Sequence, residues 1–356
     1  MSLVDIVRNF GKARVAVLGD FCLDRVIYGK HIKFSRESPA PILRVKDKFN
    51  DVKHYPGAAA NVAYNLIRLG VGQVIPFSII GEDHDGKLLL DLFEKEGINC
   101  DNILSTKDRS TYVYEKVYAQ GEGTSTPFQQ TYRIDSGSSH SISKELESEL
   151  LRCLLSLQDK FDLLIVSDYL KGIVTPEILG MVSGYGKRKF VVGTTRENAR
   201  RLKDLSLIAL NAYEVVSSYD KDKSDEEDKI PEADVCSYGT KLLSDTGSES
   251  LIVTRGERGM LVFNNKESIE DVPPTKKRKV VDITGAGDTA LAAIVASLGA
   301  GADLVTAAKI ANYAAGIVVQ KPGTATTTQE EIIAEIKNDE EKTENGSEDT
   351  PARTAC

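Results

Sequence analysis

A turn of small residues followed by an acid is the clearest sign of chemistry in this sequence. Gly285, Ala286, Gly287 and Asp288 stand between an apolar segment, 279–281, that we expect to be a strand and an alanine-rich stretch with helical spacing. Backbone N–H groups of small residues can approach an anion closely, and the start of a helix adds partial positive charge. A carboxylate there can take the proton from a hydroxyl that attacks a phosphoryl group. The pattern also fits a plain turn, with an acid in the first helical turn that the helix dipole favours.

Other polar residues follow short apolar runs that are rich in β-branched residues. Asp20, Asp168 and Asn211 each end such a run. Ligands of parallel sheets bind beyond the carboxyl ends of the strands, so we expect these residues to border a site. Asp20 could instead cap a helix. The string TRGERG, 254–259, either borders a nucleotide through its backbone or forms a tight turn between two strands.

Several common sites are excluded by their missing motifs. The sequence contains no GxxxxGK[ST] string and no GxGxxG after the first strand, which excludes a P-loop and leaves a Rossmann dinucleotide site unsupported. The five cysteines form no CxxC pair, so neither a disulfide framework nor a structural zinc site is expected. The four histidines have no ligand spacing.

The elements that must position these residues alternate along most of the chain. Apolar strand-like runs alternate with segments of helical period, which predicts an α/β fold with a mostly parallel sheet and helices on both faces. Two segments, about 31–55 and 111–135, instead alternate polar and apolar residues. They lie too far apart in sequence for a hairpin, so we expect a second, small sheet that covers the main domain as a lid.

Composition and charge narrow the partners. Of the 356 residues, 41% are hydrophobic and 28% charged, and the net charge is −8. The acidic excess lies in 220–234 and 339–356, which leaves the rest near neutral and without a basic surface for nucleic acid. No apolar run is long enough to span a membrane, and the N-terminus lacks a signal-peptide pattern, so we expect a cytoplasmic protein. The basic run 276–279 is interpreted as a solvated loop. Residues 339–356 are expected to form a disordered acidic tail after a domain over 1–338.

The chain resembles the PfkB/ribokinase family of sugar kinases over about residues 12–328. The resemblance rests on PGAAANVAYNLIRLG at 56–70 and DITGAGDTA at 282–290, in the family's order. Within the family the chain is most similar to the heptose 7-phosphate kinases. That similarity rests on GDFCLDRVIYG (19–29), SRESPAPIL (35–43), QQTYRID (129–135), VSDYLKG (166–172) and ANYAAGIVVQKPGT (311–324).

The resemblance implies a ribokinase-like fold with a β lid, and it implies ATP and Mg²⁺ as cofactors. It makes Asp288 the catalytic base, and it makes the N–H groups of Gly285, Ala286 and Gly287 the anion hole. The residues implied to bind the sugar or its phosphate are Asp20, Asp24, Gly57, Asn61, Arg133 and Lys171. Those implied to border the nucleotide are Asn211, Thr254, Gly256, Gly259 and Asn312. Asn211 and Glu214 would hold Mg²⁺ through water. A homodimer is also expected, because related kinases often pair their lids.

Three departures bear on the substrate. Where heptose kinases have Asp-Pro-Lys, this chain has Gly193-Thr194-Thr195, and Arg196 could supply the missing cation. Ala58 replaces the second glycine of the family's GGxxxN string. The HxGH motif of the adenylyltransferase often fused to these kinases does not occur. We therefore expect an ATP-dependent kinase that phosphorylates the anomeric hydroxyl of a heptose 7-phosphate. The alternatives are a kinase for another sugar, sugar phosphate or nucleoside, and a catalytically weakened sugar- or nucleotide-binding protein.

Overall fold

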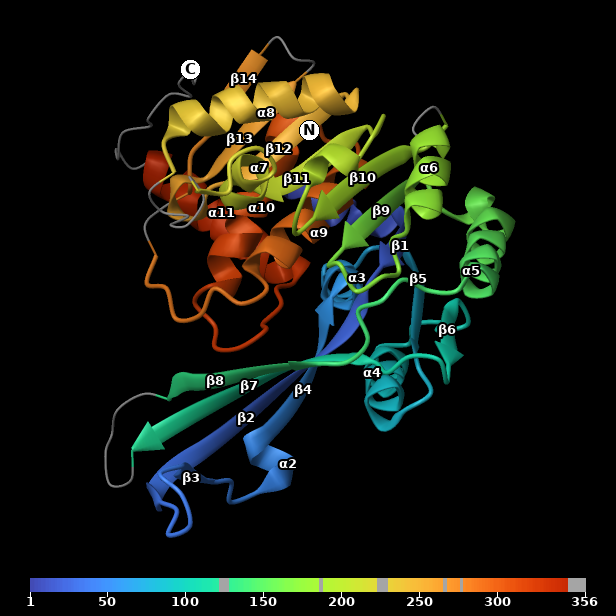
Figure 1. Ribbon diagram of the computed structural model, residues 1–356. Coiled ribbons are helices and arrows are strands. Elements are labelled where there is room, and N and C mark those ends of the chain that lie inside the picture. Colours follow the sequence, from blue (N-terminus) through green and yellow to red (C-terminus); the bar gives the residue numbers. More distant parts are fainter. Residues whose placement is uncertain (122–127, 186–187, 223–229, 265–267, 276–277, 345–356) are drawn as a thin grey trace.

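The computed structural model describes residues 1–121, 128–185, 188–222, 230–264, 268–275 and 278–344. It contains two sheets, and the chain passes from one to the other after β1, β4, β6 and β8 (Figure 1). The larger sheet lies in the body of the molecule, and the smaller sheet projects from it. This division agrees with the main domain and lid predicted from the sequence.

The larger sheet has nine strands in the order β14-β13-β12-β11-β10-β9-β1-β5-β6. All pairs from β6 to β12 are parallel, and β13 and β14 extend one edge in the antiparallel sense. The strands are β1 Arg14–Gly19, β5 Gln73–Gly81, β6 Ile103–Thr106, β9 Leu163–Asp168, β10 Phe190–Thr195, β11 Leu207–Asn211, β12 Ser250–Thr254, β13 Met260–Asn264 and β14 Ser268–Val272. The parallel core places the carboxyl ends of β1, β9, β10, β11 and β12 at one edge.

Helices cover both faces of this sheet because its central strands are apolar on both sides. Val15 and Val17 of β1 belong to one apolar cluster, whereas Ala16 and Leu18 belong to the other. The first cluster is completed by α1 Leu3–Arg8, α3 Ala59–Arg68, α4 His84–Lys95, α9 Ala286–Gly299, α10 Leu304–Val318 and α11 Gln329–Glu344. The second is completed by α5 Lys144–Ser156, α6 Pro176–Tyr185, α7 Ala212–Ser217 and α8 Glu232–Thr246. None of the helices in the described part of the chain is long and apolar enough to cross a membrane.

The smaller sheet is the lid, with strand order β3-β2-β7-β8 and β4 paired to β2. Its strands are β2 Phe21–Phe34, β3 Pro41–Arg44, β4 Val52–Ala58, β7 Tyr112–Gly121 and β8 Gln129–Ser136, and a short helix, α2 Lys48–Asp51, precedes β4. Both predicted lid segments contribute, joined by parallel pairing of β2 with β7. The first lid strand starts at Phe21, ten residues before the prediction. Its base, Phe21 to Asp24, is buried throughout and therefore shows no polar alternation.

Three local expectations were wrong. Residues 279–281 form no strand, because the N–H groups of Val281 and Asp282 share a single acceptor, the Val319 carbonyl. In the basic run 276–279, Arg278 is not solvated: its side chain is 7% exposed and lies 2.8 Å from the Glu335 carboxylate of α11. Lys279 is exposed as expected, and residues 276–277 lie outside the described residues. Cys236 is disulfide-bonded, which the cysteine spacing did not predict.

The C-terminal helix continues beyond the expected end of the folded domain. α11 extends to Glu344, past the boundary at 338 that the polarity of the sequence indicated. Asp339 accepts a hydrogen bond from Tyr313 of α10, and burial together with this acid raises the pKa of Tyr313 to about 12. Polar composition alone thus missed a contact that anchors the helix. Residues 345–356 of the expected tail lie outside the described residues.

Candidate active site

Asp288 lies in the first turn of α9, directly after the glycine-rich turn. Gly285 is the N-cap of this helix and has φ 79°, a left-handed conformation that glycine adopts without steric cost. A Cβ at Gly285 would also lie 3.0 Å from the amide nitrogen of Asn61. The turn therefore needs glycine both for its backbone and for the close approach of α3. The Ala286 N–H, predicted as part of the anion hole, instead donates to the Ile283 carbonyl at 3.2 Å. Gly287 and Asp288 line the pocket.

Two side chains hold the Asp288 carboxylate. Asn61 Nδ2 donates to Oδ2 at 2.7 Å, and the Tyr169 hydroxyl donates to Oδ1 at 2.5 Å. Burial raises the pKa of Asp288, and Arg196, Tyr169 and Asn61 partly offset this increase. A base with a raised pKa is better matched to proton transfer near neutral pH than an ordinary aspartate. Asn61, predicted to bind the sugar, here orients the base.

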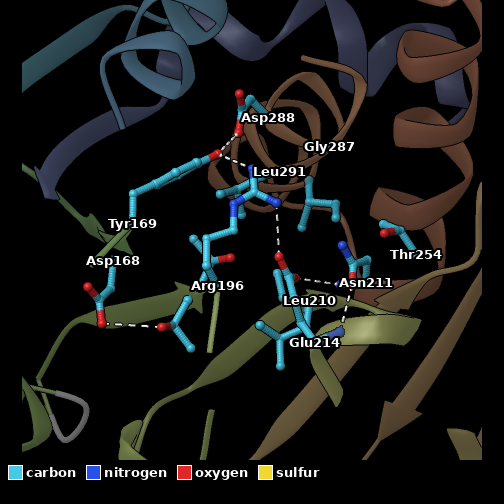
Figure 2. A pocket seen from close by; sticks show the side chains of 14 residues that line it. Asp168, Tyr169, Arg196, Leu210, Asn211, Glu214, Thr254, Gly287, Asp288 and Leu291 are labelled. Atoms are coloured by element: carbon cyan, nitrogen blue, oxygen red, sulfur yellow. Dashed lines mark hydrogen bonds and ion pairs between the residues drawn. The ribbon is translucent and has the colours of Figure 1, made fainter. Parts of the chain in front are cut away.

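Arg196 connects this pair to the opposite wall of the pocket (Figure 2). One guanidinium nitrogen donates to the Tyr169 oxygen at 2.8 Å, and another lies 3.0 Å from Oε1 of Glu214. Glu214 and Asn211 form a capping box at the start of α7, in which each side chain accepts the other's backbone N–H. The pocket is lined by the ends of β9, β10, β11 and β12 and by α9. Of the strand-end residues expected to border a site, Asp168 and Asn211 line this pocket and Asp20 does not.

Asp20 has a different role from the sugar binding expected of it. It is 1% exposed, and its two carboxylate oxygens accept the backbone N–H groups of Tyr169, Lys171 and Ile173. Burial and the nearby charge of Asp168 raise its pKa to about 6, while the three hydrogen bonds lower it. Asp20 thus holds the loop that carries Tyr169.

Asp24 is also buried, at the junction of lid and body. Its carboxylate lies 2.8 Å from Nζ of Lys116 on β7 and accepts the Thr324 hydroxyl at 3.1 Å. Gly57 packs directly on it, because a Cβ there would lie 2.5 Å from Oδ1 of Asp24. The sequence predicted Asp24 and Gly57 as neighbours at a sugar site, but it did not identify Lys116 or Thr324.

The two predicted substrate cations lie over tyrosine rings of the lid. Nζ of Lys171 is 3.9 Å from the centre of the Tyr112 ring, and the Arg133 guanidinium is 4.6 Å from the centre of Tyr114. Arg133 also pairs with Asp135 at 2.7 Å. Tyr112, Tyr114 and Tyr169 pack in one small apolar cluster. The rings therefore place both cations beside the Tyr169 end of the pocket.

The residues predicted to border a nucleotide lie only in part at the pocket. Asn211 at the end of β11 and Thr254 at the end of β12 line it, whereas Gly256, Gly259 and Asn312 are not among the lining residues. Gly256 and Gly259 have positive φ in the turn that connects β12 to β13. The Asn312 amide donates to the carbonyls of Val272 and Pro273, which fixes the chain after β14.

The sequence also matches a known protein family. The family described as pfkB family carbohydrate kinase matches residues 12–147 and 198–331. The chain belongs to the pfkB carbohydrate kinase family. Curated relatives include the bifunctional protein HldE of Trichlorobacter lovleyi, 34% identical over 90% of this chain, and that of Shewanella amazonensis, 34% identical over 92%. The chain spans 62% and 64% of the length of these two relatives.

Solved structures show the same fold for this pfkB family member. A ribokinase from Thermotoga maritima has a TM-score of 0.67 at 22% identity, covering 92% of this chain and all of that one. A ribokinase from Arabidopsis thaliana, solved with ribose and ATP, has a TM-score of 0.67 at 17% identity, covering 91% of this chain and 99% of that one. The ribokinase-like fold is therefore confirmed.

The two side chains expected to hold Mg²⁺ through water are also engaged with protein groups in this pfkB kinase. One Glu214 oxygen contacts Arg196 and the other accepts the Asn211 N–H, while the Asn211 oxygen accepts the Glu214 N–H. No group of three or more His, Cys, Asp or Glu residues in the described ranges could ligate a metal ion directly. Each Glu214 and Asn211 side-chain oxygen keeps a second lone pair, which would accept hydrogen bonds from the water shell of Mg²⁺.

The departure from the subfamily's Asp-Pro-Lys is explained by strand geometry. Gly193 faces Leu202 and Leu205 on the apolar side of β10, whereas Thr194, Thr195 and Arg196 line the pocket. Arg196 is thus a cation of the pocket, and its role toward the substrate stays a prediction. Tyr169 was the important residue that sequence reasoning missed, although it stands in the DYLKG string that had drawn attention to Lys171. Its polar neighbours come from β10 and α9, which no local pattern could reveal.

Proposed function

We propose that this pfkB kinase transfers the γ-phosphate of ATP to a hydroxyl of a sugar that already carries a phosphate. The observation that carries the substrate class is the gathering of Lys171, Arg133 and Arg196 over three packed tyrosine rings. Neutral sugar hydroxyls need no such charge. A dianionic phosphate forms charge-assisted hydrogen bonds with ammonium and guanidinium groups, which are about twice as strong as neutral ones. The sequence similarity to heptose kinases makes a heptose 7-phosphate, phosphorylated at its anomeric hydroxyl, the specific proposal.

The geometry supports a direct transfer. Asp288 takes the proton of the sugar hydroxyl, the oxygen attacks the γ-phosphorus, and the bond to the β,γ-bridging oxygen of ATP breaks. The N–H groups at the start of α9 stabilise the charge on the transferred group, because they are already oriented before the reaction. ATP would extend from there toward Thr254, Gly256 and Gly259. The lid would exclude water, which otherwise competes for the phosphoryl group.

The proposal is tested by a panel of acceptors with ATP. We expect a heptose 7-phosphate to exceed ribose, fructose and adenosine in kcat/KM by at least about tenfold, a difference of about 1.4 kcal/mol in transition-state binding. A free sugar or a nucleoside as the best acceptor would contradict the substrate and leave the kinase proposal intact. Absence of turnover with every acceptor would favour a binding protein instead.

The phosphate contacts predict a selective loss of affinity. We expect Lys171→Ala and Arg133→Ala each to raise KM for the sugar phosphate by about tenfold, since a charge-assisted bond contributes about 1.5–3 kcal/mol. The KM for an unphosphorylated analogue should change little. Lys241→Ala is the matched control, because Lys241 also lies over a tyrosine ring, that of Tyr219, away from the pocket. Equal effects on the two acceptors would rule out a phosphate contact.

The lid supports the proposal of a cytoplasmic homodimer. Tyr132 and Ile134 of β8 are 56% and 52% exposed and lie on one face of the strand. Their strand partners are Val117 and Glu115, so they occupy the face opposite Arg133 and Lys116. Exposed apolar side chains gathered on one face are typical of an interaction surface.

We expect a dimer in light scattering at micromolar concentration. The double variant Tyr132→Lys, Ile134→Lys should be monomeric, because it puts like charges on both copies of the surface. Changing exposed Leu155 of α5 and exposed Tyr213 of α7 to lysine, away from the lid, should leave the dimer intact. A wild-type monomer would contradict the proposal.

A further inference from the structure

A continuous chain of polar contacts joins the base to the far wall of the pocket. Asp288 of α9, Tyr169 after β9, Arg196 after β10 and Glu214 of α7 follow one another, each within 3.0 Å of the next (Figure 2). The four side chains come from four different elements. This chain of contacts requires the carboxyl ends of several strands to lie side by side, whereas a chance contact between two residues does not.

The direction of each hydrogen bond follows from the chemistry of its groups. A guanidinium can only donate, so the Tyr169 oxygen must accept from Arg196. The single Tyr169 proton is then left for Asp288, at an oxygen–oxygen distance of 2.5 Å. That distance is typical of a hydroxyl that donates to an ionised carboxylate. Glu214, whose side chain is 7% exposed, pairs with a different guanidinium nitrogen of Arg196 and so holds Arg196 in place.

We propose that Tyr169, supported by Arg196, is a positioning residue that holds Asp288 in its reactive orientation and in its charged form. The proposal rests on the role of Asp288 as the base. With one donor on each oxygen, from Asn61 and from Tyr169, the carboxylate cannot rotate. Each oxygen still has a second lone pair, and one of them can accept the proton of the substrate.

The charged groups around Asp288 agree with this role. Burial and the charge of Asp24 raise the pKa of Asp288, whereas Arg196, Tyr169 and Asn61 lower it. Asp24 is itself paired with Lys116. Removing the Tyr169 hydroxyl takes away one lowering contribution, so the pKa of Asp288 should rise. The base is active when ionised, and activity is lost as the pH falls through its pKa, so the acidic limb of the rate profile should move to higher pH.

The experiment compares Tyr169→Phe with Tyr219→Phe in the full chain. Tyr219 also donates its hydroxyl to an acid, Asp245 at 2.8 Å, but does not line the pocket. We expect the acidic limb of kcat/KM to shift upward by about one pH unit in Tyr169→Phe, which reduces the rate about tenfold below the limb. Tyr219→Phe should keep the wild-type profile. Arg196→Lys should shift the limb less than Arg196→Met, since the lysine can still donate to the Tyr169 oxygen.

A second readout does not depend on turnover. Carbon-13 NMR of the aspartate carboxyl groups, with Asp288→Asn to assign the signal, should show the Asp288 titration at higher pH in Tyr169→Phe than in wild type. An unchanged titration in a folded variant would overturn the proposal even if the protein has no kinase activity. A rise in kcat/KM would also overturn it, because Tyr169 would then merely block the base. If the titration shifts but no acceptor turns over, the positioning role stands and the proposed function fails.

Discussion

Replacing Asp288 by asparagine should reduce kcat by about 10²- to 10⁴-fold, the usual effect of removing a general base. Asparagine has nearly the same shape, so one of the two donors, Asn61 or Tyr169, keeps its oxygen acceptor while the other faces the amide NH2 group, and the fold should be preserved. It cannot take a proton from the sugar hydroxyl. Dissociation constants for ATP and for the sugar phosphate, measured by calorimetry, should stay within a few-fold of wild type. Rapid-quench measurement of a single turnover would assign the loss to the chemical step.

Asp303→Asn is the matched control for this variant. Asp303 also stands at a helix start, as the N-cap of α10, and asparagine caps helices about as well as aspartate. Its kcat should equal that of wild type. Turnover of Asp288→Asn within a few-fold of wild type would remove Asp288 from the chemistry.

Restoring the subfamily aspartate at position 193 should unfold the protein rather than improve it. Gly193 is buried in β10, and a Cβ there would lie 2.4 Å from Leu205 Cδ1 and within 3.3 Å of Leu202. Overpacking a core costs about 1–3 kcal/mol, and an unpaired buried carboxylate costs several more. We expect Gly193→Asp to lose at least about 4 kcal/mol of unfolding free energy in urea, or to be recovered only as insoluble protein.

Gly180→Asp makes the same change where there is space for it. Gly180 is exposed on α6, and no atom lies within 4 Å of the position its Cβ would take. This variant should lose less than about 1 kcal/mol, since glycine is itself a poor helix residue. If Gly193→Asp had wild-type stability, side chains at 193 would have to face the pocket, contrary to the register of β10.

The sequence was sufficient for the features that repeat along the chain. Strand-like and helix-like periods located the alternating elements, and parallel strands bring their carboxyl ends together, so Asp20, Asp168 and Asn211 could be expected at one edge. The turn at 285–288 was recognisable because three small residues followed by an acid, just before a helical stretch, are typical of a helix start that binds an anion. These inferences need only local patterns and one rule of topology.

What the sequence could not predict depends on partners from distant elements. Asp20 was assigned to the sugar, but its carboxylate is engaged by backbone N–H groups of the 169–173 loop, which lies some 150 residues later. Glu214 was expected to hold magnesium through water, and its ion pair with Arg196, which follows β10, was not foreseen. In both cases the residue was located correctly and its neighbour was unknown. The role of a side chain depends on the residues that it contacts in the fold, and a local sequence pattern does not reveal those residues.

The parallel pairing of β2 with β7 has a consequence for how the protein acquires its structure. Cys22 lies opposite Tyr112, and His31 opposite Gly121, so the central contact of the lid joins segments about ninety residues apart. Contacts between distant segments form slowly, because the chain between them must first lose entropy. During synthesis, β2 emerges long before β7 exists and can pair at first only with β3 and β4. The lid sheet is therefore expected to be completed only after β7 has emerged, and until then β2 keeps an unpaired edge that is open to wrong pairing.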